Sequence, residues 1–515
     1  MIKRIPFHPW LLASYFPVAL LATNIAEVKQ ATVCRLVVVM LVAAGVLFVM
    51  LNLVIRNPRK TGLLTSWLVF LVATYGLIYS FTKSTPILHG FLGHHRVMLA
   101  VLAILTGLVA WGVLKKAQHF PEITLVANLF AFYLLCFPIY QIASFSIQAK
   151  DEKMPGQTRL EANSVHTGEA LPDIYYIILD SYERQDYLGS DFQYDNSDFL
   201  NYLEEAGFYV PDCSRSNYAH TFLSLSSTLN MAYIQDLLTK DTLTEEALKN
   251  LLVHSRLRSD LESAGYQTVS FDNVHWDFSD ADHFYEFAID PFFNSYLFPI
   301  ESTFIGNSIL KLAQDVNPRF ADKIHSLEAS AVKDHYLQQQ YILDSLDAST
   351  TLDSPKFVFA HIEKPHGPYV FEPNGTFILE DAFYRDKYFA AINQDYDRLG
   401  YIKQIEYLNR RMERFVELVL KELKSEAIII IQGDHGILET DALNGRMAIL
   451  NAIYLPRQDY SQLYPSITPV NTFRIILGQF FNEDLELLDD HSYYSYREDK
   501  LEYFPVEEAN EGCIR

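Results

Sequence analysis

The sequence predicts a transmembrane region of about five helices in residues 1–147. It predicts an α/β domain with a mostly parallel sheet flanked by helices in residues 171–515. Three observations support this prediction. Long apolar runs are confined to the N-terminal region, strand-like runs alternate with helical segments after it, and the charge divides at the same place. Residues 1–150 carry 12 basic and 2 acidic side chains, a net charge of +10, whereas the remainder carries 29 and 61, a net charge of −32.

Five apolar runs define the predicted membrane region. Each approaches the roughly 20 residues that cross about 30 Å of hydrocarbon as a helix. The first is the weakest, because Pro17 and Asn24 interrupt it. A cleaved signal peptide is the alternative for this run, but no small-residue cleavage site ends it and four more runs follow. The runs lie near residues 9–26, 36–55, 62–81, 97–114 and 123–147.

The loops between these runs predict the orientation. Basic residues are more numerous in alternate loops, seven against four, which places the N-terminus in the cytoplasm. Five crossings then place everything after residue 150 outside, whereas an even number of crossings would reverse this. We therefore expect a multi-pass protein of the cell (inner or cytoplasmic) membrane with an extracytoplasmic large domain. The richer loops contain Lys3, Arg4, Arg56, Arg59, Lys60, Lys115 and Lys116, and the poorer ones Lys29, Arg35, Lys83 and Arg96.

Residues 148–170 are polar, lack a sustained apolar period and are predicted to link the two parts. The overall charge of −22 argues against a nucleic-acid-binding protein, which needs a basic surface. Four cysteines are too few for a small disulfide-stabilised domain. Cys213 and Cys513 follow the membrane region, and an oxidising compartment would allow them to pair. Their separation in sequence does not indicate whether they do.

Polar side chains capable of binding a metal stand at the ends of three predicted strands. Asp180 ends the first strand, His361 lies at the end of another, and Asp434 and His435 follow a third. Ligands of such a sheet bind at the carboxyl ends of its strands, so we expect these side chains to meet. Predicted strands cover residues 173–180, 267–272, 356–362, 426–433 and 448–456, with helices near 196–206, 221–234, 242–265 and 390–424 between them.

Asp180, Asp434 and His435 form a mixed set of oxygen and nitrogen ligands. Such a set suits Zn²⁺ or Mn²⁺ better than Ca²⁺, which prefers oxygen ligands only. Three protein ligands would leave a position for a substrate or nucleophile. Each residue also has an ordinary structural interpretation, because an aspartate after a strand often caps a turn or a helix.

Thr221 is the candidate nucleophile, because it stands where an irregular segment becomes helical. A helix N-terminus offers free N–H groups and a partial positive charge, which favour a phosphate. A metal on the threonine oxygen would favour its alkoxide. The alternative is a helix-capping threonine. Ser224, Ser226 and Ser227 are poorer candidates, because they fall inside the predicted helix.

Four segments resemble the sulfatase-like branch of the alkaline phosphatase superfamily: IILDSYERQDYL, NYAHTFLSLSSTLN, HIEKPHGPY and IIIIQGDHG. Five spans before such a domain resemble lipoteichoic acid synthases and lipid A phosphoethanolamine transferases. The resemblance implies an alkaline phosphatase-like fold and a catalytic domain over residues 171–515. It makes Asp180, Thr221, Asp434 and His435 the metal ligands and Thr221 the nucleophile. It makes His366 a contact of the transferred group or the acid for the leaving group, with His361 and Asn217 as further substrate contacts.

Two departures from the family pattern bear on the chemistry. Sulfatases of this branch carry a Cys or Ser in C/S-x-P-x-R, and the segment from Cys213 to Asn217 lacks both the Pro and the Arg at the positions that this pattern needs. Hydrolysis of sulfate esters is therefore disfavoured. The related lipid transferases often have Glu where this chain has Asp180, which leaves the choice between Zn²⁺ and Mn²⁺ open.

The resemblance implies an integral-membrane metalloenzyme that transfers a phospholipid-derived phospho-headgroup to a cell-envelope acceptor through a phospho-threonine intermediate. Its partners would be a membrane phospholipid donor and an envelope glycan or lipid acceptor, with no nucleic acid. One alternative is a hydrolase of phosphodiesters or sulfate esters on the same fold. Another is a non-catalytic envelope protein that binds glycans or partners, which is disfavoured because none of the expected metal ligands is missing.

Overall fold

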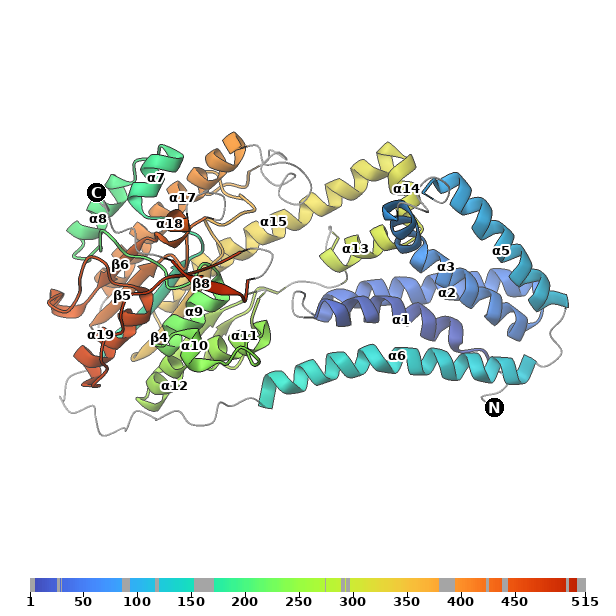
Figure 1. The fold of residues 1–515 in the computed structure, drawn as a ribbon, viewed down its shortest axis with the longest axis horizontal. Helices are drawn as coiled ribbons and strands as arrows, with labels where there is room; N and C mark the ends of the chain where they lie inside the picture. Colours follow the sequence, from blue (N-terminus) through green and yellow to red (C-terminus); the bar gives the residue numbers. More distant parts are fainter. Residues whose placement is uncertain are drawn as a thin grey trace. The chain divides into compact units, whose positions relative to one another are not determined.

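The structure is a computed structural model, and its chain divides into two compact units that are described separately (Figure 1). The first unit comprises Met1–Asp151 and Ile289–Ala331, and the second comprises Glu152–Ala288 and Val332–Arg515. The residues described are 5–25, 28, 30–85, 93–115, 120–151, 171–273, 275–288, 292, 297–378, 394–422, 426–437, 443–496 and 500–506.

Apolar helices build the first unit. They are α1 (His8–Thr23), α2 (Cys34–Ile55), α3 (Pro58–Ser84), α5 (His95–Lys115) and α6 (Phe120–Asp151), with the 3₁₀ turn η2 (Gln30–Val33) before α2. Four stretches in the described chain are long and apolar enough to cross a membrane: Gln30–Ile55, Pro58–Ser84, His95–Lys115 and Pro121–Phe145. Helix α1 has 16 residues, about 24 Å, which falls short of the hydrocarbon thickness. The predicted count of five spans is therefore not confirmed.

Residues 289–331 group with these apolar helices, although the sequence placed them inside the domain of residues 171–515. This insertion contains α13 (Pro299–Asn307), α14 (Leu310–Val316) and the first part of α15 (Pro318–Ser349). Its apolar side chains pack on the helix bundle; Phe304, for example, shares a cluster with Met40 and Val69. Most of the predicted linker, residues 152–170, lies outside the described residues.

A six-stranded sheet organises the second unit, in the order β3-β2-β4-β1-β5-β6. All neighbouring pairs are parallel except β5 and β6. The structure therefore confirms an α/β domain with a mostly parallel sheet. The strands are β1 (Asp173–Leu179), β2 (Gln267–Phe271), β3 (His283–Tyr285), β4 (Lys356–Ile362), β5 (Ala427–Gln432) and β6 (Asn451–Tyr454).

Helices cover both faces of this sheet, as the wholly apolar pattern of its central strands requires. On one face Tyr175 and Ile177 of β1 pack with side chains of α8 (Ser197–Glu205), the C-terminal half of α15, and α17 (Gln394–Glu422). On the other face Ile174 and Tyr176 pack with α9 (Thr221–Asn230), α12 (Arg256–Ser263) and α19 (Pro469–Phe481). Alternate residues of one strand thus belong to two separate cores.

The remaining elements refine the prediction. The helix expected over 242–265 is two, α11 (Glu245–Val253) and α12, because the Ser255 hydroxyl accepts a hydrogen bond from Arg258 N and starts a new helix. The helix expected over 221–234 is α9 followed by the short α10 (Ile234–Leu237). The other elements are α7 (Gln185–Phe192), α18 (Leu443–Met447), η3 (Pro456–Gln458) and the hairpin strands β7 (Tyr493–Ser495) and β8 (Tyr503–Pro505).

Candidate metal and phosphoryl-transfer site

Three adjacent strands deliver a buried group of metal-binding side chains. Strand β1 lies between β4 and β5, so the residues at their carboxyl ends become neighbours. Asp180, His361 and Asp434 each offer a ligand atom, and these atoms all lie within 4.8 Å of one another. The prediction that these strand ends meet is confirmed.

The turn after β5 fixes the Asp434 carboxylate. The backbone N–H groups of Ser181 and His435 donate to its Oδ1 at 3.0 and 2.9 Å. Its Oδ2 is buried and makes no hydrogen bond within the described part of the chain. An orphaned buried carboxylate oxygen beside a second carboxylate suits a cation. The residues present therefore fit a divalent metal.

Burial and the negative charge of Asp180 raise the pKa of Asp434 to about 7. Burial also raises the pKa of Asp180, but the imidazoles of His366, His361 and His435 outweigh it and hold that pKa well below its usual range. Two buried carboxylates this close repel each other when both are ionised. A bound divalent cation would remove that repulsion.

The His435 ring is oriented by its Nδ1, which lies 3.0 Å from the carbonyl oxygen of Gly436. Because a carbonyl only accepts, Nδ1 carries the proton and Nε2 keeps a lone pair. This Nε2 lies 3.1 Å from the Thr221 hydroxyl oxygen. The Thr221 hydroxyl therefore donates a hydrogen bond to this nitrogen.

Thr221 occupies the first position of α9, and His220 is its N-cap residue. The interpretation of Thr221 as a capping residue is therefore wrong. Its hydroxyl faces His435 and lies at a helix end whose free N–H groups attract anions. Ser224, Ser226 and Ser227 are buried and donate to backbone carbonyls, as expected for structural hydroxyls.

In His361 the proton is on the other ring nitrogen, Nε2, than in His435. The Asn273 amide nitrogen lies 3.1 Å from its Nδ1, and the amide orientation is fixed because Asn273 Oδ1 accepts from His275 N at 2.8 Å. Nδ1 is thus the acceptor and Nε2 carries the proton of the neutral ring. Nε2 faces Asp180 Oδ2 at 3.5 Å. In this arrangement His361 is a proton donor beside the carboxylates.

The family model for sulfatases matches residues 172–478, more than half of the 515-residue chain. The chain belongs to the sulfatase family. It is accordingly an enzyme with a sulfatase-like α/β domain, preceded in sequence by apolar membrane helices. Among curated proteins, none matches this sulfatase-family chain.

Several solved structures are similar to this sulfatase-family enzyme at low identity. The C-terminal periplasmic domain of EcEptC from Escherichia coli, in complex with Zn, is 11% identical, covering 65% of this chain and 87% of that one with a TM-score of 0.39. The integral membrane lipooligosaccharide phosphoethanolamine transferase A (EptA) from Neisseria meningitidis is 11% identical, covering 93% and 96% with a TM-score of 0.38. BT1596, a 2-O GAG sulfatase, is 11% identical, covering 65% and 74% with a TM-score of 0.35.

His366 joins the site from the loop after β4. Its backbone N–H donates to Asp180 O at 3.0 Å, and its ring Nδ1 lies 2.6 Å from Gly367 O. The buried Lys364 ammonium donates to the carbonyls of His366 and Pro368, both at 2.9 Å. This loop is thereby held against the end of β1. The substrate contact predicted for His366 remains a prediction.

The side-chain amide of Asn217 is hydrogen-bonded to two backbone groups. Its amide oxygen accepts from Val470 N at 2.8 Å and its amide nitrogen donates to His491 O at 2.9 Å. The side chain is buried and ties the segment before Thr221 to the start of α19. These contacts describe a structural role, and the substrate contact predicted for Asn217 has no counterpart in the described geometry.

Three residues of the sulfatase-family site were missed by the sequence analysis. The Ser181 hydroxyl donates to Asp180 Oδ1 at 2.8 Å and lies 3.3 Å from His435 Nδ1. Asn273 sets the tautomer of His361. The buried Arg446 donates to Ala219 O at 2.8 Å and to Gly436 O. Ser181 could have been suspected from its place after Asp180, but nothing in the sequence singles out Arg446 or Asn273.

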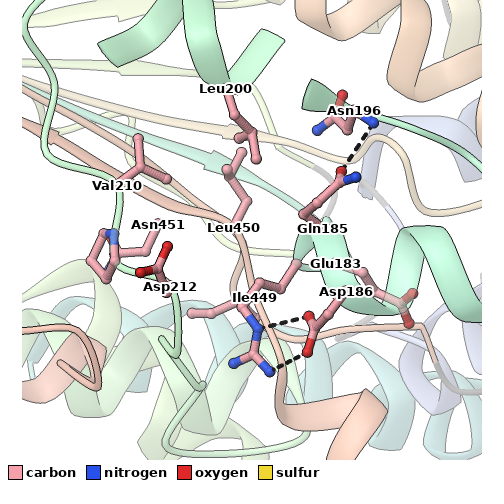
Figure 2. Close-up of a pocket in the computed structure, with 12 residues that line it drawn as sticks. Glu183, Gln185, Asp186, Asn196, Leu200, Val210, Asp212, Ile449, Leu450 and Asn451 are labelled. Carbon is pink, nitrogen blue, oxygen red and sulfur yellow. Dashed lines mark hydrogen bonds and ion pairs between the residues drawn. The ribbon is translucent and has the colours of Figure 1, made fainter. Parts of the chain in front are cut away.

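The buried Glu183 lines a small cavity (Figure 2). Asp186, Gln185 and Asn196 line it, and the Gln185 amide oxygen accepts from Asn196 N at 3.0 Å. Its volume of about 20 Å³ holds roughly one water molecule, which is far too little for a lipid headgroup. The cavity is therefore not the substrate site.

The described cysteines of the two units differ in oxidation state. Cys34 and Cys136 in the membrane unit are free, whereas Cys213 is disulfide-bonded. Cys513, which the sequence offers as a partner, lies outside the described residues.

Proposed function

We propose that this enzyme transfers a phosphorylated headgroup from a membrane phospholipid to an acceptor in the cell envelope, with Thr221 as the nucleophile. The observation that carries the proposal is the placement of the Thr221 hydroxyl, 3.1 Å from an unprotonated nitrogen of His435 and at the N-terminus of α9. A hydroxyl in such a position is set up for attack on phosphorus.

We assign the metal site to Asp180, Thr221, Asp434 and His435. The proton on His361 Nε2 argues against His361 as a ligand and favours its contact with Asp180. When bound, Zn²⁺ or Mn²⁺ would supply Lewis acidity toward the phosphoryl oxygens and the threonine oxygen. Mixed carboxylate and imidazole ligands suit both ions.

The reaction proceeds in two displacements. In the first, the Thr221 hydroxyl gives its proton to solvent, a bond forms between Thr221 Oγ1 and phosphorus, the bond from phosphorus to the diacylglycerol oxygen breaks, and the imidazolium form of His366 protonates that oxygen from Nε2. In the second, an acceptor hydroxyl attacks the phospho-threonine and gives its proton to the neutral His366, the bond from phosphorus to Thr221 Oγ1 breaks, and Oγ1 takes a proton back from solvent. One imidazole thus serves as acid and then as base.

The membrane helices support a lipid donor, because an anchored enzyme and its lipid share one bilayer plane. The disulfide-bonded Cys213 supports an extracytoplasmic catalytic domain, because disulfide bonds are rare in the cytosol. We therefore propose that α1 also crosses the inner membrane, which gives an odd number of spans. An alkaline phosphatase reporter fused after residue 155 should be active in cells. If a reporter that works only in the cytoplasm is active at the same position, this orientation is wrong.

A headgroup-labelled phospholipid tests the transfer reaction. The purified full chain should release diacylglycerol and place the label on the peptide that contains Thr221. The variant T221A should do neither, T221S should keep part of the activity, and T242A, at an exposed threonine, should match the unmodified chain. Label that appears only as free headgroup, whatever acceptor is added, would indicate a hydrolase. Mass spectrometry of envelope lipids and glycans with and without the gene would then name the transferred group.

A further inference from the structure

The hairpin of β7 and β8 is bonded to the segment that leads into Thr221. Strand β7 pairs with this segment in parallel, through a bridge between Tyr493 and Tyr218. Tyr493 N donates to Asn217 O at 2.8 Å, and Ala219 N donates to Tyr493 O at 3.2 Å. Ala219 stands two residues before Thr221. The hairpin is therefore held beside the backbone that positions the proposed nucleophile.

The side chain of His220 connects the hairpin to the candidate metal site. Its ring Nε2 lies 3.3 Å from the carbonyl oxygen of Ser495, and the centre of its ring lies 6.5 Å from that of His435. Tyr494 is also close to the site, because burial lowers the pKa of Arg446 and the Tyr494 phenol is among the groups that oppose this shift. The hairpin and the site thus share their neighbours.

One face of the hairpin packs on the catalytic unit. The rings of Tyr493 and Tyr503 both lie 5.3 Å, centre to centre, from the ring of Tyr218. All three belong to one hydrophobic cluster with the start of α9. Because successive side chains of a strand point to opposite faces, the alternate residues of both strands lie on the other face.

The other face carries three aromatic side chains that contact one another. Tyr494 stands opposite Phe504 in the strand register, and Tyr496 follows on the same side. Their ring centres lie 5.5–5.7 Å apart. Tyr496 is 58% exposed, Tyr494 and Phe504 are half-buried, and none of them belongs to a hydrophobic cluster of the described chain. We call these three side chains the aromatic face. Exposed apolar surface of this kind marks a binding site.

The chemistry of the surroundings selects among ligands. A tyrosine ring offers a flat apolar surface with a hydroxyl group at its edge. A sugar ring is complementary to it, with C–H groups on its faces and hydroxyl groups around its rim. Residues 483–508 contain ten acidic and two basic side chains, which disfavours an anionic membrane surface or a polyanionic glycan. A neutral sugar satisfies both conditions.

We propose that the aromatic face binds a neutral sugar ring of the envelope glycan that accepts the transferred group. The rings would stack on the sugar and hold its hydroxyl groups beside Thr221, without taking part in the bond changes. The role of this sugar as acceptor rests on the proposed transfer reaction, whereas its binding can be measured without any reaction.

Saturation-transfer NMR on the full chain tests the binding. The chain carries T221A, which prevents turnover, and is held in a detergent that contains no sugar. Neutral oligosaccharides released from the envelope of the producing cells serve as ligands. Irradiation of aromatic protein protons should saturate sugar C–H protons in T221A and in T221A/Y496F. The Kd should rise about 10-fold in T221A/Y496A, as expected for the loss of one stacked ring.

An exposed apolar side chain of α17 provides the control. Leu399 is 48% exposed, and T221A/L399A should bind the oligosaccharides as T221A does. Equal Kd values for T221A/Y496A and T221A/L399A would overturn the proposal, and so would the absence of saturation transfer in T221A.

The two displacements of the transfer reaction provide a second test. With Thr221 intact, Y496A should raise the KM for the oligosaccharide about 10-fold, while label from the phospholipid still reaches Thr221 as fast as in L399A. Slower labelling of Thr221 with an unchanged KM would mean that the aromatic face contacts the lipid donor, which would overturn the proposal. If no variant labels Thr221, the transfer reaction itself is wrong, and the NMR measurement decides the sugar site separately.

Discussion

The hydroxyl oxygen of Thr221 lies 3.1 Å from Nε2 of His435, although 214 residues separate them in the chain. The parallel sheet makes this possible, because β5 ends beside β1 and the N-terminus of α9 approaches the same edge. The arrangement depends on hydrogen bonds from residues that would not themselves react, and these residues can be tested separately.

Ser181 positions both Asp180 and His435 through its hydroxyl. We expect S181G and S181A to weaken metal binding by about 10–100-fold, as is typical when a group that orients a metal ligand is lost. Ser181 has a φ of 66°, so alanine should also lower the melting temperature more than glycine does. Calorimetric titration with Zn²⁺ and Mn²⁺ and thermal melts measure the two effects. Unchanged affinity in both variants would exclude a positioning role for the hydroxyl.

The two histidines beside the carboxylates should respond differently to substitution. We expect H435Q to lose metal binding, because its Nε2 lone pair is the proposed ligand, and H361Q to retain the metal while activity falls. Metal content by mass spectrometry, measured together with activity, separates the two outcomes. If H361Q loses the metal as completely as H435Q does, His361 is a ligand as well, together with Asp180 and Asp434.

Arg446 holds the segment before Thr221 and the turn after His435 to each other, through Ala219 O and Gly436 O. Burial lowers the pKa of Arg446 to about 10, so it stays protonated at neutral pH. We expect R446Q to destabilise the catalytic unit by roughly 2–5 kcal/mol, because two buried carbonyls lose a charged donor. The control R457Q, at a side chain that is 62% exposed, should have little effect. Equal melting temperatures for the two variants would contradict this role.

Glu183 should make stability depend on pH. Burial raises the pKa of its carboxyl group to about 8, so the folded state holds this proton more tightly than the unfolded state. Its contribution to stability is therefore complete below the unfolded pKa of about 4.5 and is lost as the pH rises toward 8, by at most about 1.4 kcal/mol per pH unit. E183Q should flatten the decline in melting temperature between pH 5 and 8. The exposed control E205Q should leave the decline unchanged, and a decline that persists in E183Q must come from another group.

The α/β class and the strand ends that form the site follow from local patterns in the sequence. Strands β1, β4 and β5 are continuous apolar runs that end in chemically active residues, and a parallel sheet places such ends at one edge. Asp180, Asp434 and His435 could therefore be chosen before any contact was known. The count of membrane spans was less secure, because the length of α1 falls between a span and a shorter buried helix.

Which atoms these residues use, and which other residues hold them in place, depends on contacts between distant segments of the fold. Asn217 was predicted to touch substrate, but contacts with Val470 and His491 occupy its amide. The tautomers of His361 and His435 depend on Asn273 and Gly436. The insertion of α13 and α14 beside α3 likewise follows from packing between distant segments. The periodicity of a sequence indicates whether a residue is buried. Its contact partner, however, comes from a distant segment that the fold brings close, and a local sequence pattern does not identify that segment.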